Sequence, residues 1–192
     1  PDGSGLVVPS YDGLDLLPMN PDQQGNSPQS LPGSRELKSF CSGSGRAVLL
    51  RNWPDYRRSI ELVIPGQPPR QVWLGEAGVM ATACDNRGEK IWIVLRDASP
   101  TLRDELLLVN SSGSVLKRRY FPGWYLASGA ILDVDPATNR LLTVMTDGDG
   151  AQRRAALIDG SSLEFELLKP QVVLARWLPA GGELDEFSKV RR

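Results

Sequence analysis

GEKIWIVL, at residues 88–95, shows the pattern that decides the fold: a turn glycine leads into a short run of apolar residues. Three other stretches of this 192-residue chain have the same form. They are GLVVPS at residues 5–10, GRAVLL at residues 45–50 and NRLLTVM at residues 139–145. The four stretches begin at residues 5, 45, 88 and 139, so they are 40, 43 and 51 residues apart. A polar loop, a second apolar strand and another turn follow each of them. A period of about 40–50 residues with roughly four strands in each unit is typical of a β-propeller blade.

This repeat predicts an all-β propeller of four-stranded antiparallel blades, as a single domain over residues 1–192. The units cover residues 1–33, 36–75, 79–123 and 124–171, and a partial unit covers residues 172–192. After the strands at 5–10 and 14–19, strands are predicted at 39–41, 47–51, 59–64 and 71–74; at 79–84, 90–96, 105–110 and 115–121; and at 127–133, 140–146, 154–159 and 164–168. Residues 20–34 are rich in Pro, Gly, Gln, Asn and Ser, which predicts a loop. Strands such as 90–95 are apolar almost throughout, as expected where both faces of a sheet are covered.

The two ends of the chain are compatible with two arrangements. The apolar run at 172–178 is typical of a first strand, whereas the chain begins just before a second strand. A strand at 172–178 could therefore complete the blade begun by residues 1–19, and four blades would close into a ring without an open edge. The alternative is a piece of a larger propeller, because residues 179–184 repeat a turn that residues 1–6 already supply.

Cys41 and Cys84 occupy equivalent places in neighbouring units, each four residues before the lead-in glycine, Gly45 or Gly88. Equivalent positions on the first strands of neighbouring blades are usually too far apart for a disulfide, whose Cα atoms must lie within about 7 Å. We therefore interpret both cysteines as small buried residues, with a disulfide as the alternative. Two cysteines do not decide the redox compartment.

The composition argues against catalysis and against metal binding. The chain contains no histidine, which excludes Ser-His-Asp and Cys-His catalysis and histidine-based metal sites. Glu164 and Glu166 face one side of a predicted outer strand, with nothing nearby to raise the pKa of either carboxyl group. Asp147 and Asp149 lie in an Asp-Gly turn that lacks the twelfth-position glutamate of a calcium loop. We therefore predict a protein that is not an enzyme and has no cofactor and no metal.

The same bulk properties limit the partners. A net charge of −1 gives no field that would attract nucleic acid. No stretch approaches the roughly 18 consecutive apolar residues of a membrane-spanning helix. We predict a protein partner.

Two aromatic segments are the predicted contact sites for that partner. WPDY at residues 53–56 and PGWY at residues 122–125 are expected in loops between strands. Loop aromatics are enriched at protein contacts, and the arginine fork suits a partner surface. The alternative is packing that anchors the two loops. Trp92 and Trp177 lie inside apolar runs and are predicted to be core residues. The predicted binding residues are Trp53, Tyr56, Arg57, Trp124 and Tyr125.

Three segments resemble the repeats of TolB-like (WD-type) β-propellers. PDGSGLVV at 1–8 resembles the "Ser-Pro-Asp-Gly-x-x-Ile-x-Phe" element of those repeats. DLLPMNPD at 15–22 is similar to the "Asp-Ile-Tyr-Val-Met-Asn-x-Asp-Gly" element, and RWLPAGGEL at 176–184 to the "Trp-Ser-Pro-Asp-Gly-Lys" start. The turns of the middle units depart from this pattern. The resemblance implies either protein–protein contact in the bacterial envelope or a gating domain attached to a peptidase.

Together, these observations predict a non-catalytic propeller scaffold that binds a protein partner. The resemblance places it in the periplasm or another extracytoplasmic compartment of a bacterium. The alternative is an accessory or glycan-binding propeller domain of a larger hydrolase.

Overall fold

The chain forms β-structure throughout the part that the structure describes. A computed structural model describes residues 5–10, 13–18, 29–41, 44–97, 103–172 and 174–177. Strands β1 to β16 follow one another through these residues, and no helix occurs among them. The strands form four antiparallel sheets, and each sheet is built from consecutive segments of the chain. The predicted all-β class is confirmed.

The first two sheets end at Gly75. The first sheet has the order β1-β2-β3, with β1 (Gly5–Ser10), β2 (Gly13–Pro18) and β3 (Gln29–Pro32). The second sheet has the order β4-β5-β6-β7, with β4 (Arg35–Cys41), β5 (Arg46–Asn52), β6 (Arg58–Val63) and β7 (Arg70–Gly75). Strand β3 shows that the prediction of a loop over the whole of 20–34 was wrong. Its composition is loop-like, but Pro32 is tolerated because it ends a strand at the edge of a sheet.

The third and fourth sheets make up the rest of the described chain. The third has the order β8-β9-β10-β11, with β8 (Gly78–Cys84), β9 (Lys90–Arg96), β10 (Asp104–Asn110) and β11 (Val115–Tyr120). In the fourth, β12 (Trp124–Leu126) and β13 (Asp133–Val134) both pair with β14 (Arg140–Asp147), and β15 (Arg153–Asp159) and β16 (Phe165–Gln171) follow. The single strand predicted at 127–133 was therefore wrong. A turn closed by the Ala130 N–H and the Ala127 carbonyl, with Gly129 in the left-handed region at φ 72°, interrupts it.

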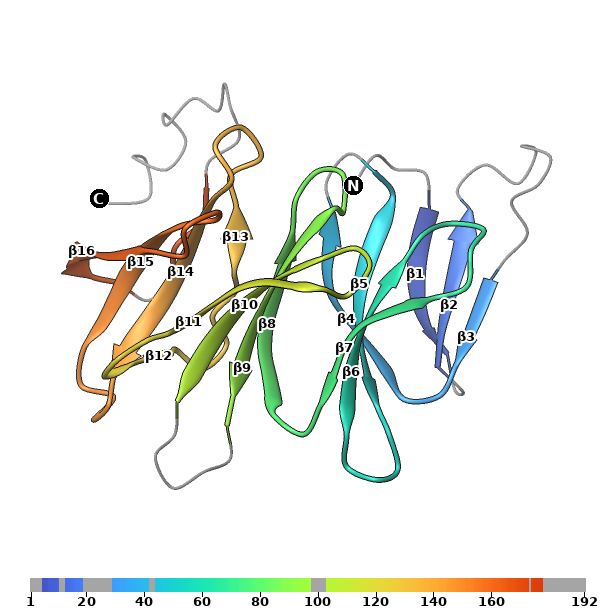
Figure 1. Ribbon diagram of the computed structural model, residues 1–192, viewed down its shortest axis with the longest axis horizontal. Coiled ribbons are helices and arrows are strands. Elements are labelled where there is room, and N and C mark those ends of the chain that lie inside the picture. Colours follow the sequence, from blue (N-terminus) through green and yellow to red (C-terminus); the bar gives the residue numbers. More distant parts are fainter. Residues whose placement is uncertain are drawn as a thin grey trace, which may run out of the picture.

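The four sheets stand side by side in chain order, with the first sheet at one end of the row and the fourth at the other (Figure 1). Within the second and third sheets, the first strand lies at one edge, and these two edge strands, β4 and β8, contact each other. Sheets of about four strands packed face to face around such inner strands are the arrangement of propeller blades. The predicted propeller-like fold is confirmed.

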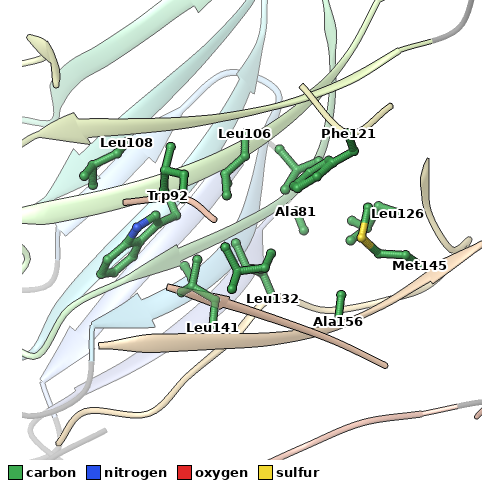
Figure 2. Close-up of a cluster of buried hydrophobic side chains, with 14 residues drawn as sticks. Ala81, Trp92, Leu106, Leu108, Phe121, Leu126, Leu132, Leu141, Met145 and Ala156 are labelled. Atoms are coloured by element: carbon green, nitrogen blue, oxygen red, sulfur yellow. The ribbon is translucent and has the colours of Figure 1, made fainter. Parts of the chain in front are cut away.

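Three apolar clusters fill the spaces between neighbouring sheets. The first and second sheets share a cluster that includes Leu14, Leu31 and Leu49. The second and third sheets share a larger one, and the third and fourth sheets share the largest, which Figure 2 shows in close-up. The middle sheets are thus covered on both faces, as the almost continuously apolar strands predicted.

Strand β9 shows how one strand serves two clusters. Trp92 and Val94 point into the cluster shared with the fourth sheet, whereas Ile91 and Ile93 point into the cluster shared with the second. Trp92 is completely buried, which confirms its predicted core position, and its Nε1–H donates to the carbonyl of Gly160 at 2.8 Å. A Cβ atom at residue 160 would lie 2.1 Å from the Asn139 carbonyl oxygen, so only glycine fits at this crossing.

Of the two alternatives for the chain ends, ring closure through a strand at 172–178 is not seen in the described residues. Among the described residues of that range, 172 and 174–177, none is in a strand. Trp177 lies half-buried against the fourth sheet, where its backbone N–H donates to Asp133 Oδ2 at 2.9 Å and its Nε1–H to the Asp133 carbonyl at 3.3 Å. Strand β1 is at the opposite end of the row (Figure 1), so the described sheets form an open row.

A disulfide joins Cys41 and Cys84, and here the interpretation of two separate buried thiols was wrong. The two Cα atoms are 5.1 Å apart. The cysteines end β4 and β8, the inner strands of neighbouring sheets, and these strands lie close together. Two residues before each cysteine, the hydroxyl groups of Ser39 and Thr82 form a hydrogen bond of 2.8 Å between the same strands. Repeat-equivalent positions are therefore near neighbours at the inner edge of the row.

Candidate functional site

The loop between β5 and β6 contains three of the five predicted binding residues. Trp53, Tyr56 and Arg57 all lie in it, as predicted. The loop closes on itself, because the Trp53 N–H donates to the Arg57 carbonyl at 2.9 Å and the Tyr56 N–H donates to the Trp53 carbonyl at 3.1 Å. Tyr56 has φ 66°, in the left-handed region, and 87% of its surface is exposed. The loop therefore holds a bulky aromatic residue in an uncommon backbone conformation with its ring in solvent.

An ion pair inside the loop fixes the residue that follows Tyr56. Arg57 donates from Nε to Asp55 Oδ2 at 2.7 Å and from its backbone N–H to Asp55 Oδ1 at 3.3 Å. Desolvation raises the pKa of the Asp55 carboxyl, but the hydrogen bonds and charge of Arg57 together outweigh it and hold that pKa below its ordinary value. The charge of Arg57 is thus balanced within the loop at neutral pH.

Trp53 anchors the loop to the second sheet. Its Nε1–H donates to Ser59 Oγ at 3.0 Å, and the Arg51 Cζ atom lies 3.8 Å from the centroid of its ring. Trp53 is half-buried and Ser59 is completely buried. These contacts correspond to the loop-anchoring alternative for Trp53, and they also hold the guanidinium of Arg51 against an aromatic face.

Arg51 belongs to a charged cluster that the sequence analysis missed. Arg51 on β5 lies directly opposite Arg35 on β4 in the strand register. Glu61 on β6 serves both, with Oε2 at 2.8 Å from Arg35 Nε and Oε1 at 3.5 Å from Arg51 Nη1. The side chains of Arg35 and Glu61 are each only 6% exposed. The signal available in the sequence was a charged residue inside each of two predicted apolar strands, Arg51 in 47–51 and Glu61 in 59–64.

The equivalent position in the third sheet has its own carboxylate. Arg96 on β9 lies directly opposite Asp104 on β10, and it donates to both carboxylate oxygens at 2.6 and 2.8 Å. The hydrogen bond to Asp104, which outweighs desolvation, raises the pKa of Arg96 above its ordinary value. Asp104 is completely buried and also accepts from the Leu126 N–H at 2.6 Å, so this pair ties the third sheet to the fourth.

Trp124 and Tyr125 lie in β12, where the prediction of a loop was wrong. Both are half-buried, and Trp124 packs against the largest apolar cluster. The guanidinium of Arg154 lies 5.8 Å from the Trp124 ring centroid, and that of Arg96 lies 5.8 Å from the Tyr125 ring centroid. The third sheet separates these two residues from the 53–57 loop in the row (Figure 1), so the five predicted residues do not form one site.

A cavity of about 300 Å³ lies along the inner strands, bordered by β4, β8 and the segment that leads into β13. Each charged side chain that lines it has an oppositely charged partner. Arg176 lies 4.0 Å from Asp133, which also lines the cavity, and Lys38 pairs at 2.8 Å with Glu36, which lies outside the lining. Ser39 and Thr82, which also line the cavity, share the hydrogen bond described above.

No group of three or more His, Cys, Asp or Glu side chains in the described ranges is placed to hold a metal ion. Within the same ranges, no helix has the length and apolar character needed to cross a membrane.

Comparisons with known proteins bear on the fold of this chain and not on its activity. No protein-family model matches the sequence, and no similar curated protein is found. Among solved structures, an uncharacterized protein from Listeria monocytogenes EGD-e is similar over 78% of this chain and 46% of its own, with a TM-score of 0.56 and 9% identity. A structure from a study of two prolyl endopeptidases is similar over 87% of this chain and 26% of its own, with a TM-score of 0.57 and 12% identity. TolB from Acinetobacter baumannii is similar over 92% of this chain and 49% of its own, with a TM-score of 0.51 and 18% identity.

These likenesses support a β-propeller-like fold, and the resemblance to TolB-like repeats has a distant structural counterpart. Because each identity is below 20%, the likenesses carry no statement about activity. The chain spans less than half the length of each of the three proteins.

Proposed function

We propose that this chain is a non-catalytic, β-propeller-like module that binds another protein through its 53–57 loop. The observation that carries the proposal is Tyr56, whose ring is exposed while its backbone is fixed. Tyrosine is among the residues enriched at the energetic centres of protein interfaces. Because the backbone that carries the ring is already fixed, less conformational freedom is lost on binding than from a flexible loop, which favours affinity.

The surroundings of Tyr56 support the same proposal. Trp53 on one side is fixed by Ser59 and Arg51, and Arg57 on the other is fixed by Asp55. The Arg57 side chain is 46% exposed, so a charged fork stands beside the aromatic ring. Tyrosine beside arginine at a rigid loop is a common composition for the centre of a protein contact.

For the compartment, we propose an extracytoplasmic location. The Cys41–Cys84 disulfide supports it, because disulfides persist in oxidising compartments and are rare in the cytosol. The resemblance to TolB-like repeats supports the same location.

The proposal is tested by placing a photo-crosslinking amino acid at residue 56 and irradiating the producing cells. We expect one discrete protein adduct, and its yield should fall when wild-type protein is added as a competitor. The matched control is the same amino acid at Tyr120, an aromatic residue that is 50% exposed on strand β11. The same adduct at both positions, or none at position 56, would contradict the proposal.

A glycan array distinguishes the protein-binding role from the alternative, a glycan-binding module. Binding of a defined sugar that is lost in Tyr56→Ala would favour a glycan-binding module, because an exposed aromatic ring also stacks on sugars. No sugar binding, together with a discrete adduct at residue 56, supports the protein-binding role.

A further inference from the structure

We infer that Arg35 and Arg51, the arginine pair of the second sheet, form a binding site for a carboxylate group of an acidic protein segment. This inference rests on the proposed function in one respect: the carboxylate is taken to belong to the bound protein. The site combines an excess positive charge, an unpaired buried donor on Arg35 and a partly exposed arginine, Arg51.

The charges of the site do not balance. The two arginines are directly opposite each other in the register of β4 and β5, and like charges at such positions repel. Glu61 is the carboxylate that both contact, and it lies closer to Arg35, at 2.8 Å, than to Arg51, at 3.5 Å. Two positive charges and one negative charge leave a net charge of +1 in a largely buried cluster.

The third sheet provides an internal comparison. There the residue opposite the equivalent arginine, Arg96, on the inner strand is Gly78, so a single arginine meets a single carboxylate, Asp104. In the second sheet, Ser59 occupies the position of Asp104, and its hydroxyl accepts from Trp53. At this position the second sheet thus has two arginines and one carboxylate, Glu61, whereas the third sheet has one arginine and one carboxylate.

One donor of the pair has no partner. Arg35 Nη1 is a buried nitrogen without a hydrogen bond, although Nε and Nη2 of the same side chain donate to Glu61. An unsatisfied buried donor of a charged group is costly, so a ligand that accepts from it would be favoured.

Arg51 is the member of the pair that solvent reaches. Its side chain is 30% exposed, whereas that of Arg35 is 6% exposed. Gly33, in the exposed turn between β3 and β4 with φ 92°, lies beside both arginines. A Cβ atom at residue 33 would lie 3.6 Å from Arg35 Nη1 and 3.9 Å from Arg51 Nε and Nη2, in van der Waals contact with both. A ligand that arrives from solvent would therefore contact Arg51 first, beside Gly33.

The ligand class follows from charge and shape. A single carboxylate brings one negative charge, which equals the local excess. Its two coplanar oxygens match the planar fork of a guanidinium, and stacking on Trp53 already holds the Arg51 fork in one plane. The site lies on the same sheet as the 53–57 loop, so one acidic segment could contact both.

The test is an NMR titration of the protein with a tetraglutamate peptide, with the arginine Nε–H signals as the readout. We expect saturable shifts of the Arg35 and Arg51 signals and unchanged Arg96 and Arg118 signals. A tetraglutamine peptide should bind at least about tenfold more weakly, because it lacks the charge. Equal shifts with both peptides, or tighter binding of inorganic phosphate than of tetraglutamate, would overturn the inference.

Three variants make the test specific. Arg51→Gln should weaken the peptide by about tenfold, and so should Ser59→Asp, which supplies the carboxylate found in the third sheet. Arg118→Gln is the matched control, because Arg118 lies on strand β11 of the third sheet, away from both proposed sites and 3.7 Å from Glu105, and it should bind as the wild type does. In every variant the Arg96 signal, fixed by Asp104, reports that the fold is intact. Wild-type affinity in Ser59→Asp, or lost affinity in Arg118→Gln, would overturn the inference.

The two proposals fail separately. Peptide binding at the arginine pair without any adduct at residue 56 would leave the carboxylate site standing and remove the proposed protein contact. An adduct at residue 56 without peptide binding would support the proposed protein contact and remove the carboxylate site.

Discussion

Removing the disulfide between β4 and β8 should cost this protein a large part of its stability. The perturbation is the double substitution Cys41→Ala and Cys84→Ala, which avoids burying a hydroxyl group in place of either sulfur. The two cysteines are 43 residues apart in the sequence. Cross-linking a loop of that length lowers the entropy of the unfolded chain by an amount worth about 4 kcal/mol at 25 °C. We therefore expect the free energy of unfolding to fall by about 4 kcal/mol.

The assay is urea unfolding followed by tryptophan fluorescence. For a chain of this size we expect an m-value of about 2–3 kcal/mol per molar urea, so the urea midpoint should fall by roughly 1.3–2 M. Wild-type protein in a thiol reductant is the matched control and should reach the same midpoint. The double variant should not respond to the reductant.

A loss below about 1 kcal/mol would refute this reasoning, because it would mean that the bond does not constrain the unfolded chain as the entropic account requires. Further destabilisation of the double variant by the reductant would also refute it. The sequence has only two cysteines, and the double variant retains neither of them.

Three further predictions concern the core and the loop. Asp104→Asn removes the buried charge opposite Arg96 and should lower the free energy of unfolding by about 3 kcal/mol in urea; a change below 1 kcal/mol would show that the pair is dispensable. Trp92→Phe keeps most of the buried ring but loses the hydrogen bond to Gly160, so a loss of about 1–2 kcal/mol is expected in thermal unfolding. The folded-state pKa of Asp55 lies below its ordinary value of 3.8, so its ion pair stabilises the loop fully above pH 3.8 and is lost as the pH falls through the lower, folded-state pKa. Amide exchange at Arg57 should accelerate in that acidic window, and Asp55→Asn should abolish the transition.

The fold could be read from the sequence because its strongest signal is local. Strands such as β9 are apolar on both faces, and this pattern with its turns recurs often enough to define the units. The exceptions have local causes. Strand β3 has the composition of a loop because an edge strand tolerates Pro32, and the expected strand at 127–133 is split by the turn at Gly129.

The misjudged features depend on distances between units, which periodicity does not supply. The spacing placed Cys41 and Cys84 at equivalent positions, but only the close approach of the inner strands brings their Cα atoms to 5.1 Å. Arg35 and Arg51 likewise lie opposite each other only because of the register between strands β4 and β5. A bulge between Leu37 and Ser39 shifts that register, and no pattern in the sequence marks it.

The bond between the inner strands also has a mechanical consequence. When the chain is pulled from its two ends, force bypasses the segment between the cysteines and runs through the sulfur atoms instead. The 43-residue separation corresponds to about 150 Å of extended contour length that tension alone cannot release. Strands β5 to β8, which lie between the two cysteines, would therefore keep a fixed maximum extension under load while strands outside the bond peel away, and reduction would release the protected length.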